Sequence, residues 1–101
     1  MRRRSWTFLT SQALVFLHVV RHPRDTVIHI AHELGLAERT VAGILSDLRV
    51  TGYLTAQRVG QRNLYSVNPQ LHMRHPSQSH YTVQDFFASL EGIEQEEPYQ
   101  S

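Results

Sequence analysis

Apolar residues recur at helical spacing through the first half of the chain and predict three helices, at residues 10–21, 28–34 and 38–51. Thr10 or Ser11 can cap the first helix, and Pro23 follows its end. Gly35 follows the second helix, and glycine readily takes the left-handed conformation that ends helices. The third helix begins weakly, because Ala37 stands where a serine or threonine cap is expected.

The first predicted helix is apolar around almost its whole circumference. A helix that covers one face of a small core needs a single apolar stripe, so a second surface must cover the other face. Aromatic residues upstream of this helix, and an apolar helical pattern near the end of the chain, enlarge the same kind of surface. We therefore predict a subunit interface that contains Trp6, Phe8, Phe16, Phe86, Phe87 and Leu90.

From Tyr53 the period shortens toward two and predicts a β-hairpin, with strands at 54–59 and 64–67 around the turn signal Gly60-Gln61-Arg62-Asn63. Thr82 and Asp85 have the spacing of a capping box and open a further helix. The predicted organisation is a basic arm at 1–5, a domain of helices and hairpin at 6–68, an irregular connector at 69–80, a dimerisation helix at 81–93 and a disordered acidic tail at 94–101.

Charge is divided unevenly along the chain. Residues 1–80 hold all ten arginines and four acidic residues, whereas residues 81–101 hold five acidic residues and no basic ones. A basic body indicates an anionic partner. Every basic residue is arginine, which suits bidentate contacts with phosphate and guanine. The chain has no cysteine, which excludes disulfides, thiolate metal sites and a cysteine nucleophile.

The sequence also restricts the cellular setting and the chemistry. No stretch approaches the roughly 20 apolar residues of a membrane span. The apolar run at 13–20 is followed by Arg21-His22-Pro23-Arg24 instead of a small-residue cleavage site. We therefore expect a soluble, cytoplasmic protein without a membrane partner. Glycine-rich phosphate loops, nucleophile elbows and paired carboxylates are missing from the sequence, so we expect neither enzymatic activity nor a cofactor.

Histidines occur in three groups that raise the question of a metal site. They are His18 with His22, His29 with His32, and the set His72, His75 and His80. The sequence offers no cysteine and no carboxylate that is evidently paired with them. We interpret these histidines as surface or hydrogen-bonding residues and predict no metal site.

A helix-turn-helix pattern joins the second and third predicted helices. Ala31 is small where the helices cross, Gly35 makes the turn, and Val41 and Ile44 hold the third helix against the second. With the hairpin that follows, the sequence resembles winged helix-turn-helix regulators of the MarR and ArsR type, and in particular short actinobacterial-style regulators. The resemblance covers about residues 5–91 and includes Trp6-Thr7-Phe8-Leu9-Thr10, Glu38-Arg39, His75-Pro76 and His80-Tyr81-Thr82-Val83.

The resemblance implies a mainly α fold with a small β-hairpin wing (α+β), to which a C-terminal helix is added. It also implies a homodimeric transcriptional regulator that binds double-stranded DNA, with a recognition helix at 38–51 in the major groove and a wing at 54–67 on the backbone or minor groove. The DNA-binding positions carried over are Glu38, Arg39, Thr40, Gly43, Ser46, Arg58 and Arg62. Two alternatives stay open: a winged-helix module that binds proteins, and a metal- or ligand-responsive switch on the same fold.

Overall fold

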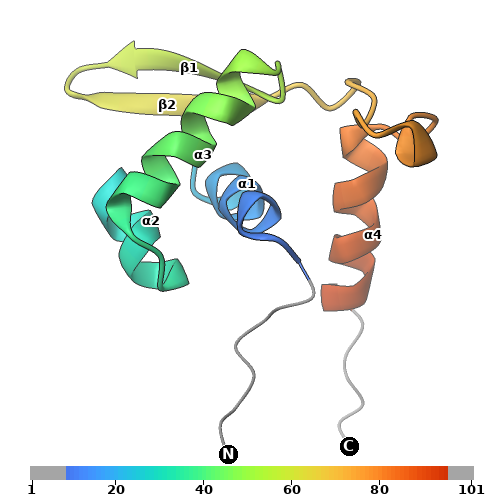
Figure 1. The fold of residues 1–101 in the computed structure, drawn as a ribbon, viewed down its shortest axis with the longest axis horizontal. Coiled ribbons are helices and arrows are strands. Elements are labelled where there is room, and N and C mark those ends of the chain that lie inside the picture. The colour runs from blue at the N-terminus through green and yellow to red at the C-terminus, as the bar shows by residue number, and fades with distance from the viewer. Residues whose placement is uncertain (1–8, 96–101) are drawn as a thin grey trace, which may run out of the picture. The chain divides into compact units, whose positions relative to one another are not determined.

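A computed structural model describes residues 9–95 and divides the chain into two compact units, the first ending at Ser66 and the second beginning at Val67. The elements in order are α1 (Ser11–Arg21), α2 (Val27–Leu34), α3 (Glu38–Val50), β1 (Leu54–Val59), β2 (Arg62–Val67), the 3-10 helix η1 (Pro76–Gln78) and α4 (Val83–Gln95) (Figure 1). The predicted α+β class is confirmed. The predicted arm and the residues Trp6 and Phe8 lie outside the described residues.

Local capping sets the helix boundaries close to the predicted ones. The Thr10 hydroxyl accepts from the Ala13 N–H at 3.2 Å, and the Thr26 hydroxyl accepts from the His29 N–H at 3.2 Å. Thr26 therefore starts α2 one residue before the predicted position. Gly35 ends α2 with φ of 68°, the left-handed conformation that its lack of a Cβ permits. Ala37 makes no side-chain cap at the start of α3, as the sequence predicts.

The core of the first unit lies where the three helices meet. Each of α1, α2 and α3 packs against the other two, and α3 also packs against β1. The fully buried side chains in this unit are Val15, Val19, Ile30, Val41 and Leu54. Removing each from water contributes about 1.5–3 kcal/mol to folding. Because Val41, Ile44, Leu45 and Leu48 are the buried residues of α3, the opposite face of this helix is left to solvent.

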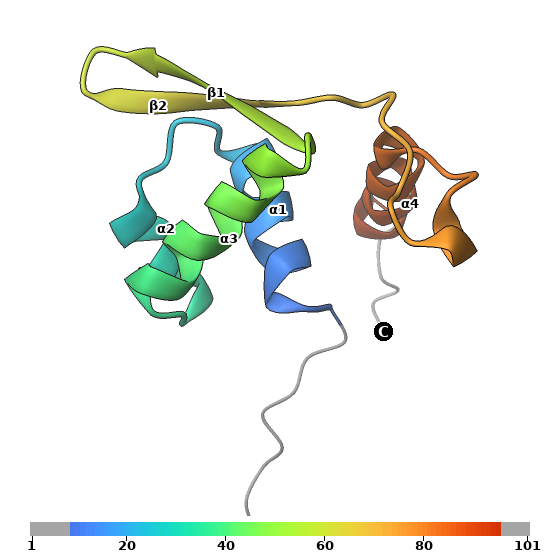
Figure 2. The same ribbon diagram turned by 45° about the horizontal axis from the view of Figure 1, so that its top comes forward.

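The hairpin is a two-stranded sheet that lies along one end of the three helices (Figure 2). Its second strand begins at Arg62, two residues earlier than predicted, so the four-residue turn was wrong. Gly60 has φ of 64°, and with Gln61 it reverses the chain in two residues, which brings Arg62 and Asn63 into the strand. The Tyr65 N–H also donates to the Pro23 carbonyl at 2.9 Å, which joins β2 to the turn between α1 and α2.

The segment at 69–80, predicted as an irregular connector, contains local structure. His72 and Thr82 form an antiparallel bridge, and η1 lies between them in the chain. The predicted capping box is confirmed: the Asp85 N–H donates to the Thr82 hydroxyl at 3.2 Å, and the Thr82 N–H donates to the Asp85 carboxylate at 2.9 Å. Helix α4 runs to Gln95, into the segment predicted as tail. Among residues 9–95, helices with the length and apolar character of a membrane span are absent.

Candidate nucleic-acid interface

Helix α3 presents a continuous exposed face opposite the core. The side chains predicted to face a groove are all exposed there, namely Glu38, Arg39, Thr40, Gly43 and Ser46. Glu38 lies in the first turn, where its negative charge stabilises the positive end of the helix that Ala37 leaves without a side-chain cap. Arg49 adds a second exposed cation in the last turn. The helix therefore exposes one cation near each end, and it also exposes Glu38, Asp47 and the apolar Val50.

Gly43 lies in the middle of this face, and packing within the chain does not explain it. A Cβ built at Gly43 would meet no atom within 4 Å. Glycine in a helix interior costs about 0.8–1 kcal/mol relative to alanine. The exposed glycine therefore destabilises α3 without relieving a clash in the chain, and it lets another molecule approach the helix backbone closely.

The hairpin arginines lie next to the start of α2. Arg58 and Arg62 are both exposed, and they line a hollow of about 170 Å³ together with Thr26 and Val27. The Arg58 Nε–H donates to the Gly60 carbonyl at 3.4 Å, which curls this side chain back over its own turn. One Arg62 N–H donates to the Arg24 carbonyl at 3.4 Å.

Two further arginines were missed by the sequence interpretation. Arg21, Arg24 and Arg62 line one open depression of about 440 Å³ at the turn between α1 and α2. The run Arg21-His22-Pro23-Arg24 is visible in the sequence, but there it marks only the end of a helix. The fold places this turn beside β2, and so it assembles a cationic surface from residues far apart in the chain.

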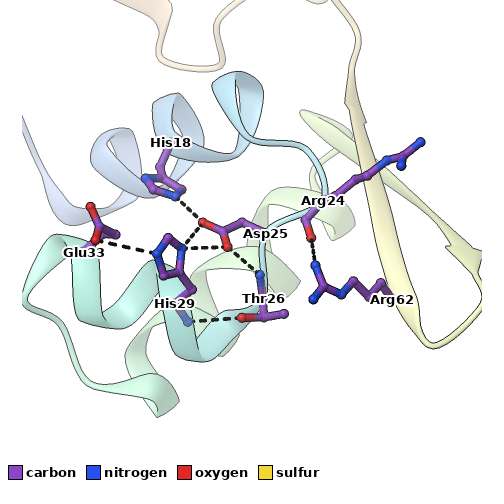
Figure 3. A network of polar contacts seen from close by, with 7 residues as sticks. All are labelled: His18, Arg24, Asp25, Thr26, His29, Glu33 and Arg62. Carbon is purple, nitrogen blue, oxygen red and sulfur yellow. Dashed lines mark hydrogen bonds and ion pairs between the residues drawn. The ribbon is translucent and has the colours of Figure 1, made fainter.

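A polar cluster at the same turn contradicts one premise of the sequence interpretation. Asp25 pairs with two histidines: its Oδ2 lies 2.7 Å from His18 Nε2 and 2.7 Å from His29 Nδ1 (Figure 3). Asp25 Oδ1 accepts from the Thr26 N–H at 3.0 Å. On the far side of the His29 ring, Nε2 lies 3.6 Å from Glu33 Oε2. The expectation that no carboxylate pairs with these histidines was therefore wrong.

The cluster shifts the protonation of its members. Burial raises the pKa of the Asp25 carboxyl, but hydrogen bonds from His18, His29 and the Thr26 N–H outweigh it and hold that pKa at about 2. The hydrogen bond to Asp25 is in turn the main cause that raises the pKa of His29. The connector histidines serve local structure: His72 Nδ1 bonds the Ser79 carbonyl at 2.7 Å, and the His75 side chain caps η1.

The predicted interface residues that the structure describes fall into two groups. Phe16 is 6% exposed, and its ring lies 5.7 Å from that of Tyr53, so it belongs to the core of its own chain and offers little surface to a partner. On α4, the side chain of Val83 is fully buried, and three further apolar side chains are half-buried, namely Phe86, Phe87 and Leu90. Their part in an interface stays a prediction.

Comparison with known proteins finds no matching family model and no matching curated protein. Solved structures do match. A predicted DNA-binding transcriptional regulator from E. coli shares 21% identity with a TM-score of 0.56, over 79% of this chain and 73% of that one. The homodimeric winged helix-turn-helix DNA-binding domain of a possible ArsR-family regulator from Mycobacterium bovis shares 21% identity with a TM-score of 0.51, over 91% of this chain and 75% of that one. The fold is a winged helix-turn-helix.

A third structural neighbour is larger. Staphylococcus aureus MarR, solved with salicylate and kanamycin, shares 16% identity with a TM-score of 0.58, over 87% of this chain but only 55% of its own. The chain thus spans about half of that MarR protein. Two of these neighbours are described as a predicted and a possible transcriptional regulator. In winged-helix terms, α2 and α3 form the helix-turn-helix and β1–β2 forms the wing.

Proposed function

We propose that this chain is a homodimeric transcriptional regulator that binds double-stranded DNA, with α3 in the major groove and the wing on the backbone or minor groove. The observation that carries the proposal is the exposed face of α3, with Arg39 in its first turn, in the same unit as the wing arginines Arg58 and Arg62. The basic character of residues 1–80 and the regulator neighbours support it.

Binding to duplex DNA at two salt concentrations tests the proposal. Fluorescence anisotropy with a labelled random-sequence duplex should detect binding at low salt and a steep loss of affinity at high salt, because phosphate contacts release counterions. Selection of bound duplexes from a random pool should then yield one enriched sequence. A chain that binds no duplex at either salt concentration supports the alternative of a protein-binding winged helix.

Replacing Arg58 with alanine should flatten the salt dependence of duplex binding. Each lost phosphate contact lowers the slope of log affinity against log salt by about 0.9, with little change in sequence preference. Arg62→Ala should lower the slope too, and it also removes the bond to the Arg24 carbonyl. The charge-matched control is Arg74→Ala in the second unit, which should keep the parent slope. Parent slopes in both hairpin variants would show that the hairpin does not contact DNA.

Replacing Gly43 with alanine should separate stability from binding. The free energy of unfolding should rise by about 0.5–1 kcal/mol, because the helix gains propensity and the new Cβ meets nothing. Affinity for the selected duplex should fall, since the Cβ stands between the helix and the groove floor. Urea unfolding and anisotropy measure the two effects, and Ala42→Gly is the control that lowers stability at the neighbouring exposed position. A Gly43→Ala variant that binds as tightly as the parent argues against close approach at this point.

A further inference from the structure

The cluster at the turn between α1 and α2 brings two imidazoles and a carboxylate to one point. His18 comes from the last part of α1, Asp25 from the turn, and His29 from the first part of α2. One ligand-capable atom from each of them lies within 4.8 Å of the other two. We propose that His18, Asp25 and His29 bind one divalent transition-metal ion, of which zinc is the representative.

The donor set favours this class of ion. Neutral imidazole nitrogens with one carboxylate oxygen suit zinc and its first-row neighbours, whereas magnesium and calcium prefer oxygen donors alone. The set leaves one tetrahedral position for water. The His22 ring has its centroid 4.8 Å from that of His18, and His22 lines the same depression as Asp25 and His29.

The distances between the ligand atoms must change before an ion fits between them. A tetrahedral zinc ion holds nitrogen and oxygen ligands at about 2.0–2.2 Å, which sets the ligand atoms roughly 3.3–3.6 Å apart. Asp25 now lies 2.7 Å from each histidine nitrogen. The three ligand atoms lie within 4.8 Å of one another. The carboxylate must therefore withdraw by less than about 1 Å, and the two histidine nitrogens must approach each other by up to about 1.5 Å, to admit the ion. Each ring nitrogen that binds the ion must be unprotonated.

Glu33 lies near the second ring nitrogen of His29, at an ion-pair distance that must shorten to become a hydrogen bond. Its carboxylate lies 3.6 Å from His29 Nε2, while His29 Nδ1 points toward Asp25. An acceptor on the second ring nitrogen fixes the tautomer and orientation of a metal-bound histidine. Glu33 also adds a second negative charge, which offsets the arginines Arg21, Arg24 and Arg62 that line the same depression as Asp25 and His29.

The three proposed ligands differ in how far their side chains are exposed to solvent. The side chains of His18 and Asp25 are 11% and 14% exposed, whereas that of His29 is 56% exposed. The inner pair is held by the fold and the third ligand is open to solvent, so an ion can enter from the side of α2. The exposure of His29 also makes it the safest ligand to replace without disturbing the fold.

The test uses the full chain without an affinity tag, stripped of metal by a chelator and dialysed. Isothermal titration calorimetry with Zn²⁺ should show one ion bound per chain, with a Kd on the order of micromolar or below. Co²⁺ should give visible absorption bands of a four-coordinate site, and either ion should raise the Tm.

Variants locate the ion. His29→Ala and Asp25→Asn should each weaken Zn²⁺ binding at least about 100-fold, and Glu33→Gln about tenfold. His32→Ala, which removes an exposed histidine of the same helix, and the combined replacement of His72, His75 and His80 by alanine should leave the Kd unchanged. Far-UV circular dichroism verifies that His29→Ala is folded.

The proposal is overturned by any of three results. These are a parent chain that binds neither Zn²⁺ nor Co²⁺ up to about millimolar concentrations, undiminished binding in a folded His29→Ala variant, or loss of binding in the variant of the connector histidines. None of these results depends on DNA binding, so the metal site and the proposed function fail or stand separately.

Discussion

Replacing Phe86 and Leu90 with aspartate should convert the dimer that we propose into monomers or insoluble protein. Both side chains are half-buried on α4, and the second unit buries few other apolar residues beyond Val83. An apolar surface of this kind is best covered by a second copy of the chain. An aspartate buried in such an interface without a partner costs several kcal/mol, so association should be lost. Sedimentation velocity at tens of micromolar, an order-of-magnitude condition, measures the effect.

A control on the same helix distinguishes lost association from lost folding. Ala88 is exposed on α4, and Ala88→Asp introduces the same charge two residues from Phe86. This variant should sediment like the parent. Since Phe86 also lines a cavity with Met73 and Tyr81, circular dichroism must confirm that the double variant retains its helices. A parent chain that sediments as a monomer at this concentration would count decisively against α4 as a dimer helix.

Replacing Arg39 with alanine should weaken binding to the selected duplex by about 1–3 kcal/mol, roughly five- to 150-fold. Arg39 is the long cation in the first turn of α3, the part of the helix that leads into the groove. Its guanidinium can hold O6 and N7 of one guanine together, so base preference should blur at one position in each half-site. A symmetric dimer should place two half-sites about 34–36 Å apart as an inverted repeat. Binding to a panel of single-base variants measures both effects.

The comparison with Arg49→Ala decides what kind of contact Arg39 makes. Arg49 is exposed in the last turn of the same helix, so its loss should weaken all duplexes to a similar degree. If Arg39→Ala has that uniform effect too, Arg39 contacts phosphate. Specificity would then have to come from the shape of the DNA.

The helices could be predicted from the sequence because their signals are local. Thr10, Gly35 and the pair of Thr82 with Asp85 act through atoms within a few residues, and the structure shows each in its predicted role. The hairpin was predicted too, but the predicted turn was two residues too long. Gly60 has a positive φ, but sequence spacing does not tell which of its neighbours enter the strand.

The polar cluster could not be predicted, because it depends on how two helices cross. His18 and His29 lie on opposite sides of the turn that holds Asp25, and the packing of α1 against α2 brings them together. The same reasoning applies to Phe16. Its helix is apolar on every side, and the sequence does not show which side the core will use. The structure assigns Phe16 to the core beside Tyr53.

The bond between Tyr65 and Pro23 has a consequence for how this sequence can diverge. Both atoms belong to the backbone, so the anchor that holds the wing to the helices does not depend on which side chains stand at these positions. Proline at position 65 is the one substitution that would remove the donor directly. The surface of the wing is therefore free to change its charges while its attachment persists. A change at a residue such as Arg58 would alter the charge of the wing and leave its backbone attachment in place.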